Sequence, residues 1–317
     1  MIKKILNISL FMCLACAASA QSPVDVRKLG VISSEQAHNT VWENKLYRQV
    51  EFLSDSLCGG RATGTRGSTE AAFWIARRFG QLGLLPFSGQ YTKHFYGPFG
   101  RNMIGMIPGN SRGKNDSYVL VLAHYDGLGT LNGKLYPGAD SNASGVVAMV
   151  SIAEMFSAMR LLGRAYDTNV IFAAVDAKSS SMKGSRALWD MIEKERLIDP
   201  VTGNVISADR IRMVVNIDQI GGTSSRLKSG REDFIIMLGR DKVGKKYADL
   251  LSWCDSRYSI DLELGFDYFG SKEFTDVFYR RVCDQKVFVE NGVPAVLFTS
   301  GITMNNNKTY DSPRTLN

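Results

Sequence analysis

Polar side chains gather where three apolar, strand-like runs of this 317-residue chain end. His124 and Asp126 close the run "YVLVLAHYD", and Asp218 closes "IRMVVNID". The run "NVIFAAVD" is followed by Lys178 and Ser179. Because the carboxyl ends of parallel strands meet at one edge of a sheet, we expect these side chains to share a crevice. Histidine and carboxylates together are usual ligands of a hydrolytic zinc centre, so the pattern favours such a site.

The alternative is a structural histidine that only forms hydrogen bonds. Of the three histidines, His38, His94 and His124, only the last follows a strand of the central region. A serine hydrolase is a third class, raised by "SSS" at 179–181 and "FTSG" at 298–301. No histidine lies downstream of these serines to act as a base, so we set this class aside.

The elements around these residues alternate between strands and helices. We expect strands at 101–109, 118–126, 168–176, 211–218, 233–239 and 294–301, and helices at 34–55, 69–83, 142–159, 182–195, 244–257 and 283–292. Near-continuous apolar strands indicate a sheet covered on both faces. The alternation predicts one three-layer α/β/α sandwich domain with a mostly parallel, mixed central sheet. The Gly-rich stretch "LCGGRATGTRGS" does not match a phosphate-binding loop, and we expect a flexible connection to a helix that Ser68 opens.

The first twenty residues have the features of a secretory signal peptide. "MIKK" is basic, "ILNISLFMCLACA" is apolar but too short to span a membrane, and "ASA" ends at Ala20. We therefore expect cleavage after Ala20, a single mature domain of residues 21–317, and a periplasmic or secreted protein. A buried N-terminal helix and a lipoprotein anchored at Cys16 are the weaker alternatives.

Composition and charge limit the classes of partner that the protein is expected to bind. The 44% apolar and 22% charged residues are typical of a globular protein. The net charge of +7 falls to +5 when Lys3 and Lys4 leave with the signal peptide, and no Lys/Arg run of the nucleic-acid-binding kind occurs. No second apolar stretch has transmembrane length. Of the three mature cysteines, Cys254 and Cys283 are the expected disulfide pair and Cys58 the free thiol.

Longer segments resemble the zinc aminopeptidases of metallopeptidase family 28. "HYDGLG…YPGADSNASGVVAMVSIAEMF" is similar to the zinc-binding core of that family, in which His-x-Asp precedes Gly-Ala-Asp-Asp-Asn-Ala-Ser-Gly. "SLCGGRATGTRGSTEAAFWIARRFGQLGL", "VVNIDQIGG" and "CDQKVFVENGVPAVLFTSG" resemble its entry segment, its Asp-bearing strand and its last helix–strand unit. The likeness runs from about residue 45 to the end and implies a zinc-exopeptidase (phosphorylase/hydrolase-like) fold.

The resemblance implies a site for two zinc ions that share a bridging carboxylate. His124 and Asp218 match the ligands of one zinc, and Asp126 matches the residue that orients this site. Four other positions differ from the family pattern. The bridging Asp is replaced by Ser141, the general base Glu by Lys178, a zinc-binding Glu by Ser179 and a zinc-binding His by Asn307.

These replacements predict a non-catalytic member of the family. Neutral serine and asparagine oxygens bind zinc poorly, and two remaining ligands fall short of the three that a catalytic zinc normally has. Loss of a general base alone costs about 10²–10⁴-fold in rate. We expect no zinc or at most one weakly bound ion, and a crevice that binds a peptide or small-molecule ligand. The alternative is an active exopeptidase with one metal on His124, Asp218 and Asp140.

Lys178 also has a predicted structural role. Without zinc, the carboxylates of Asp126 and Asp218 would be buried without a counter-charge, which is costly. We expect the Lys178 ammonium to occupy the vacated metal position and pair with one of them; the alternative is a solvated Lys178. Family members normally continue beyond the final "YDSPRTLN" into another helix, so a truncated chain or a required partner is a further expectation. No pattern specifies an oligomeric state.

Overall fold

The computed structural model describes residues 1–16, 35–95, 99–110, 116–164, 166–223, 227, 229–244, 247 and 249–317. Within these residues a nine-stranded sheet has the order β1-β3-β7-β4-β8-β11-β9-β10, and β2 pairs with β3. The strands are β1 Leu85–Pro86, β2 Thr92–Phe95, β3 Gly100–Ile107, β4 Tyr118–His124, β7 Asn169–Val175, β8 Ile211–Ile217, β9 Phe234–Leu238, β10 Glu263–Gly265 and β11 Ala295–Thr299.

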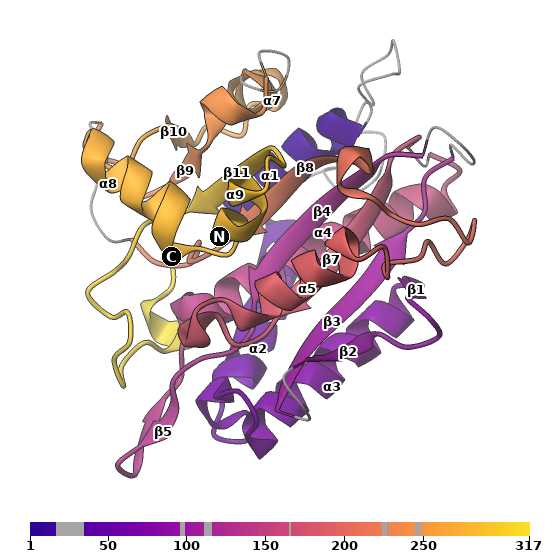
Figure 1. Ribbon diagram of the computed structural model, residues 1–317. Coiled ribbons are helices and arrows are strands. Elements are labelled where there is room, and N and C mark those ends of the chain that lie inside the picture. The colour runs from indigo at the N-terminus through magenta and orange to yellow at the C-terminus, as the bar shows by residue number, and fades with distance from the viewer. Residues whose placement is uncertain are drawn as a thin grey trace.

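Strand direction sets which residues share an edge of the sheet. The central strands β7, β4, β8 and β11 are parallel, so their carboxyl ends lie together. The sheet reverses at both sides, because β3 is antiparallel to β7 and β9 is antiparallel to β11. A separate hairpin, β5 Gly129–Leu131 and β6 Lys134–Tyr136, projects from the body (Figure 1).

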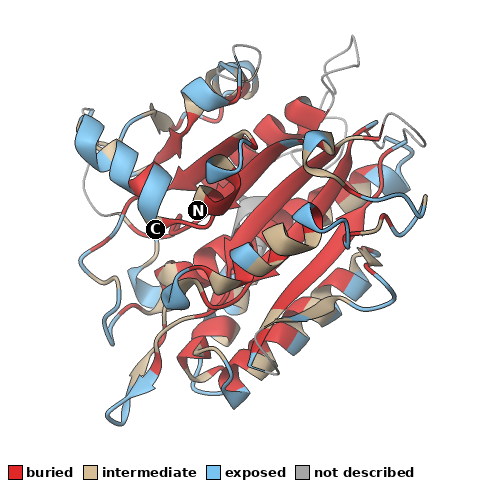
Figure 2. Cartoon of the chain, viewed as in Figure 1, coloured by how far each residue is buried: buried red, intermediate tan, exposed pale blue. Residues whose placement is uncertain are grey.

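Every residue of β4 and of β7 is buried, as expected for strands covered on both faces. Because side chains alternate along a strand, Val119 and Val121 contribute to one apolar cluster and Leu120 and Leu122 to another. Figure 2 shows the buried sheet between layers whose outer surfaces are exposed.

Helices cover both faces of the sheet. The first face carries α1 Ile2–Cys16, α2 Glu35–Ser54, α3 Arg66–Gln81, α4 Ser144–Leu161 and α7 Leu250–Tyr258. The second face carries α5 Lys183–Glu193 and α9 Gln285–Glu290, and α8 Lys272–Val277 leads to a third apolar cluster beside β9. The predicted three-layer α/β/α architecture with a mostly parallel, mixed sheet is therefore confirmed.

The N-terminal helix α1 packs into this core. It contacts α4 and α7, and the Phe11 ring meets the Phe298 ring of β11 edge to face at 5.4 Å. The expected cleavage after Ala20 falls outside the described residues and stays a prediction. Among the described helices, the segment 139–161 is apolar and long enough to cross a membrane, but it is 72% buried inside the fold, as core helices are.

Two local expectations are wrong. Thr65, not Ser68, caps α3: its hydroxyl accepts a hydrogen bond from the Ser68 amide at 3.2 Å. All five cysteines are free, so Cys254 and Cys283 do not form a disulfide. The expected export favoured a disulfide, but the distance between the two thiols depends on the fold: Cys254 belongs to the apolar cluster that includes α7, and Cys283 belongs to the cluster beside β9.

Candidate functional site

The predicted crevice residues come from three neighbouring strands. His124 ends β4, Lys178 follows β7, and Asp218 follows β8, with β4 paired to both of the others. Since these strands are parallel, their ends meet at one edge of the sheet. The structure thus brings together the side chains that were predicted to meet because they follow the carboxyl ends of parallel strands.

Lys178, Asp218 and His124 form a compact cluster. The Lys178 Nζ donates to Asp218 Oδ2 at 2.5 Å and lies 3.3 Å from His124 Nε2. His124 Nε2 is also 3.3 Å from Asp218 Oδ1. Lys178 was predicted to pair with Asp218 or Asp126, and the structure confirms the pair with Asp218. The solvated alternative is wrong, because the Lys178 side chain is only 16% exposed.

The charges of this cluster stabilise one another. Burial opposes ionisation of each group, yet Lys178 and His124 hold the pKa of Asp218 far below its ordinary value. Asp218 in turn raises the pKa of Lys178 despite its burial. Burial and the Lys178 ammonium lower the pKa of His124, but Asp218 and Asp126 outweigh them and raise it to about 9. At neutral pH the imidazole therefore carries two protons and has no free lone pair.

Asp126 fixes the loop that carries Lys178. Its Oδ1 accepts from the Lys178 amide at 2.9 Å, and its Oδ2 accepts from the Ser179 amide at 3.2 Å and the Ser179 hydroxyl at 2.9 Å. On its other side, Asp126 Oδ1 lies 3.4 Å from His124 Nδ1. Ser179, at a position where the family has a zinc ligand, is thus turned toward Asp126.

Asp140 and Ser141 are held by a different set of contacts. Asp140 Oδ1 accepts from the amides of Gly221 and Gly222 at 2.8 and 3.0 Å. Ser141 Oγ accepts from Gln219 Nε2 at 3.3 Å. The structure therefore gives Asp140 partners other than His124 and Asp218, the two residues with which it was expected to hold a single metal.

The hollow beside Ser141 is small. Asn307 and Ser141 both line it, together with Tyr136 and Asp311, and it holds about 10 Å³. That volume accommodates roughly one water molecule. Ser141 and Asn307, two positions where the resemblance implies zinc ligands, therefore line the same hollow, which Lys308 and Asp311 also line.

A zinc ion does not fit the residues at this edge of the sheet. A metal ligand must be deprotonated, whereas Asp218 and Asp126 raise the pKa of His124 despite its burial, and the Lys178 ammonium contacts both His124 and Asp218. No group of three His, Cys, Asp or Glu side chains in the described part of the chain is arranged to hold a metal ion.

Three residues of the site were missed from the sequence. Asp311 accepts from the amides of Asp140 and Ser141 at 2.8 and 3.2 Å and so anchors the turn between β6 and α4. The Cys283 thiol is buried beside Asp218 and Lys178, and burial raises its pKa. In the sequence, Asp311 lies in the final segment "YDSPRTLN", which predicted no site residue, and Cys283 was expected as a disulfide partner.

The third missed residue is Arg61, within the stretch expected to be flexible. The Arg61 side chain is fully buried and donates to the carbonyl oxygens of Tyr125, Pro137 and Gly138 at 2.8 Å each, and also to that of Leu53. The expectation of flexibility is wrong, because this guanidinium ties the Gly-rich segment to the residues after β4 and β6.

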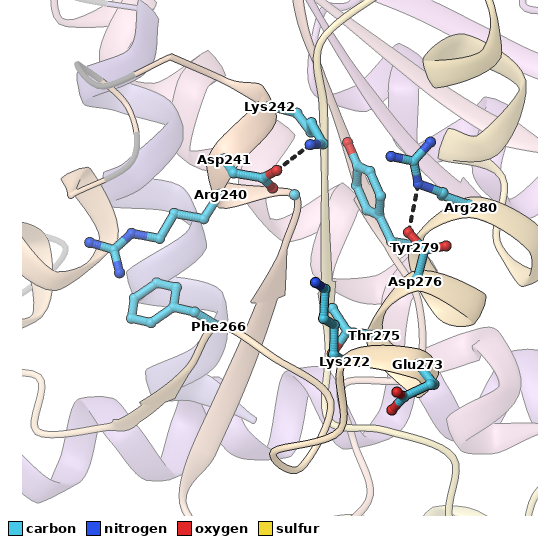
Figure 3. Close-up of a pocket in the computed structure, with 11 residues that line it drawn as sticks. Arg240, Asp241, Lys242, Phe266, Lys272, Glu273, Thr275, Asp276, Tyr279 and Arg280 are labelled. Carbon is cyan, nitrogen blue, oxygen red and sulfur yellow. Dashed lines mark ion pairs between the residues drawn. The ribbon is translucent and has the colours of Figure 1, made fainter.

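A separate cavity of about 950 Å³ lies away from this cluster (Figure 3). It adjoins Gly239, which follows β9, and since β9 is antiparallel to β11 this end of β9 lies at the opposite edge of the sheet. Two ion pairs form within its lining, Lys242 with Asp241 and Arg280 with Asp276. It contains none of the predicted site residues.

The fold and the site can now be compared with known proteins. A family model described as "Peptidase family M28" matches residues 102–315. The chain belongs to peptidase family M28. No curated protein sequence matches it at a significant level.

Solved structures of similar fold share little sequence with this M28 chain. The LapA aminopeptidase of Legionella pneumophila has a TM-score of 0.65 at 14% identity, over 88% of this chain and 68% of that one. A zinc aminopeptidase of Bacillus subtilis has a TM-score of 0.62 at 14% identity, over 86% and 90%. The glutaminyl cyclase of Porphyromonas gingivalis has a TM-score of 0.58 at 14% identity, over 86% and 91%. At these identities the likeness shows the fold alone.

Proposed function

We propose that this protein is a non-catalytic member of family M28. The observation that carries the proposal is the Lys178 ammonium, 2.5 Å from Asp218 and 3.3 Å from His124. A cation in contact with both remaining ligand positions repels a metal ion and occupies the Asp218 oxygen that the ion would need. It also stands where the family has a general base, and an ammonium cannot accept a proton.

Zinc content and peptidase activity test this proposal together. We expect the purified protein to retain no stoichiometric zinc after incubation with zinc and dialysis, and to show no hydrolysis of aminoacyl chromogenic substrates. One zinc per chain that is lost in His124→Ala, together with hydrolysis, would instead establish the single-metal exopeptidase.

A restored variant provides the positive control. We expect Ser141→Asp, Lys178→Glu, Ser179→Glu and Asn307→His, combined in one chain, to bind zinc, because they return the residue types that the family resemblance implies. The same chain with Lys178 left unchanged should bind zinc much more weakly, since the ammonium stays beside Asp218. Equal zinc affinity of the two chains would mean that Lys178 is not the obstacle.

The remaining role of the crevice is proposed to be binding of a peptide or another small molecule, in a protein exported after cleavage at Ala20. The partial exposure of the Lys178 side chain, 16%, supports access of a ligand to the cluster. A thermal-shift screen with peptide mixtures tests it. Stabilisation that Lys178→Met abolishes is expected; identical shifts in both proteins would place binding elsewhere.

A further inference from the structure

The helix α1 fills an apolar groove formed by α4, α7 and β11, here called the α1 groove. Leu10, Phe11 and Met12 of α1 are completely buried. Phe11 packs on Phe298 of β11, and Cys13 Sγ lies 3.8 Å from the Met159 sulfur of α4. The residues with which a signal peptide would reach a membrane are thus the ones that pack against the protein.

Polar contacts fix α1 in one register. Asn7 Nδ2 donates to Asp255 Oδ1 at 3.1 Å, and Thr168 Oγ1 donates to the Cys16 carbonyl at 3.1 Å. Met1, at the start of α1, donates its amino group to the Asn317 carbonyl at 2.7 Å, so the two termini are adjacent (Figure 1).

One cation of α1 is buried at the end of the groove. Lys4 is 2% exposed, and its Nζ donates to Ser300 Oγ at 2.8 Å and to the Ile220 carbonyl at 3.1 Å. Burial lowers the pKa of Lys4 to about 8, and the negative charge of Asp140 opposes this shift. Asp140 is itself 2% exposed, and its Oδ2 has no hydrogen-bond partner. An apolar helix without a cation would leave this buried carboxylate without any compensating charge.

We propose that the α1 groove is a helix-binding site, and that after cleavage at Ala20 it receives an apolar helix of a partner protein that carries one buried lysine or arginine near its N-terminal end. Before cleavage, α1 occupies the groove in cis. The charge complementarity between Asp140 and the incoming cation selects the partner, and the apolar contacts hold it. This inference is independent of the proposal for the Lys178 cluster.

Thiol labelling of the uncleaved 1–317 chain tests the first part. Cys13 and Cys16 lie on α1 and are buried, as are the other three cysteines. We expect no thiol to react under native conditions and five to react in denaturant. Two fast-reacting thiols in the native chain would show that α1 does not occupy the groove and would overturn the proposal.

Substitution of Lys4 tests the role of the buried cation, and substitution of Lys3 is the matched control. Lys4→Met should speed labelling of Cys13 and Cys16 at least tenfold, because the groove loses its charged contact. Lys3→Met should not, because the Lys3 side chain is 50% exposed and contacts Asp233 and the Asp261 carbonyl at the surface. Equal labelling rates in the two variants would mean that the charge of Lys4 does not hold α1 in the groove, and the proposed selection of a cation by Asp140 would be wrong.

A relocated helix tests the groove without α1 at the N-terminus. Because Met1 lies beside Asn317, residues 2–16 can be appended after Asn317 through a short Gly-Ser linker in a chain that starts at residue 21. The 21–317 chain should either melt at a lower temperature than 1–317 and bind an apolar dye, or fail to fold. The appended helix should reverse either defect. An appended helix that carries Lys4→Met should not.

Two results would overturn the proposal. The first is a 21–317 chain that matches 1–317 in melting temperature and dye binding, since the groove would then need no occupant. The second is a 21–317 chain that dimerises and separates into monomers when the helix is appended, since the occupant would then be a second copy rather than a partner protein.

Discussion

Lys178 is the residue on which the chemistry of the site depends. Its ammonium compensates the Asp218 carboxylate, whose side chain is only 3% exposed, and it contacts the imidazole that would otherwise bind a metal. A buried ion pair need not stabilise a fold relative to apolar residues, but removal of one partner leaves the other charge uncompensated. The substitution of a base by a lysine therefore affects folding as well as catalysis.

We expect Lys178→Met to lower the free energy of unfolding by about 3 kcal/mol, because Asp218 stays buried without its counter-ion. Lys194→Met is the matched control: Lys194 is 57% exposed and pairs with an exposed Asp190, so its loss should cost roughly 0.5 kcal/mol or less. Denaturant unfolding of both variants measures the difference. Adding Asp218→Asn to Lys178→Met should recover part of the loss; no recovery would contradict the pairing.

Four site residues were predicted because they follow apolar runs, which indicate where buried strands end: His124, Asp126, Lys178 and Asp218. Asp311 and Cys283 could not be found in the same way. Their side chains reach the site from connections whose paths depend on the packing of the whole chain, and neither residue follows an apolar strand.

Elements with long apolar runs were predictable, and short, exposed ones were not. The ranges expected for β4, β7, β8, β9 and β11 each contain the observed strand. The β5–β6 hairpin, β2 and β10 were missed because they have three or four residues each and no continuous apolar run. Pairing with a neighbour, not the local sequence, makes these segments strands.

The Gly-rich segment before α3 shows a similar dependence on distant partners. Gly60 has φ +71°, and a Cβ there would lie 2.5 Å from the Tyr136 carbonyl oxygen, so only glycine fits. Arg61 then donates to carbonyl oxygens from three other parts of the chain. The glycines, which match no phosphate-loop pattern, predicted a flexible segment. The sequence does not show that the carbonyl oxygens that accept from Arg61 lie close to it.

We expect Arg61→Lys to destabilise the fold by about 2–4 kcal/mol, because a lysine cannot reach all of these carbonyl oxygens and each unsatisfied buried group costs about 1–3 kcal/mol. Arg77→Lys, at an exposed position of α3, should leave stability unchanged. Chemical denaturation compares the two. A loss of stability in both variants alike would mean that the forked geometry of Arg61 is not what matters.

At the scale of the whole molecule, buried carboxylates set the pH dependence of stability. Burial raises the pKa of Asp140 and of Asp176 to about 6, above the unfolded value of 3.8. The folded state then binds more protons than the unfolded state between about pH 4 and 6, so stability falls as the pH rises through this window. Asp218 and Asp126 have lowered pKa values, so their contribution is present above the unfolded value and is lost as the pH falls below it.

We therefore expect the melting temperature to be highest near pH 4, close to the unfolded pKa of 3.8 at which these opposed titrations meet. Asp140→Asn should flatten the fall between about pH 4 and 6, because the amide does not ionise while its oxygen can still accept from Gly221 and Gly222. Melting curves across the pH range provide the measurement. A melting temperature that rises steadily from pH 4 to 7 would contradict these buried-carboxylate pKa values.

The β5–β6 hairpin gives the molecule a natural place for a reporter. Its turn residues Asn132 and Gly133 are exposed, and both adopt the left-handed backbone conformation that a tight two-residue turn requires. The hairpin projects from the body, while its base, at Gly129, contacts Gly60 of the rigid segment held by Arg61. A fluorophore or epitope inserted at this turn would follow the orientation of the domain without touching the sheet, the Lys178 cluster or the α1 groove.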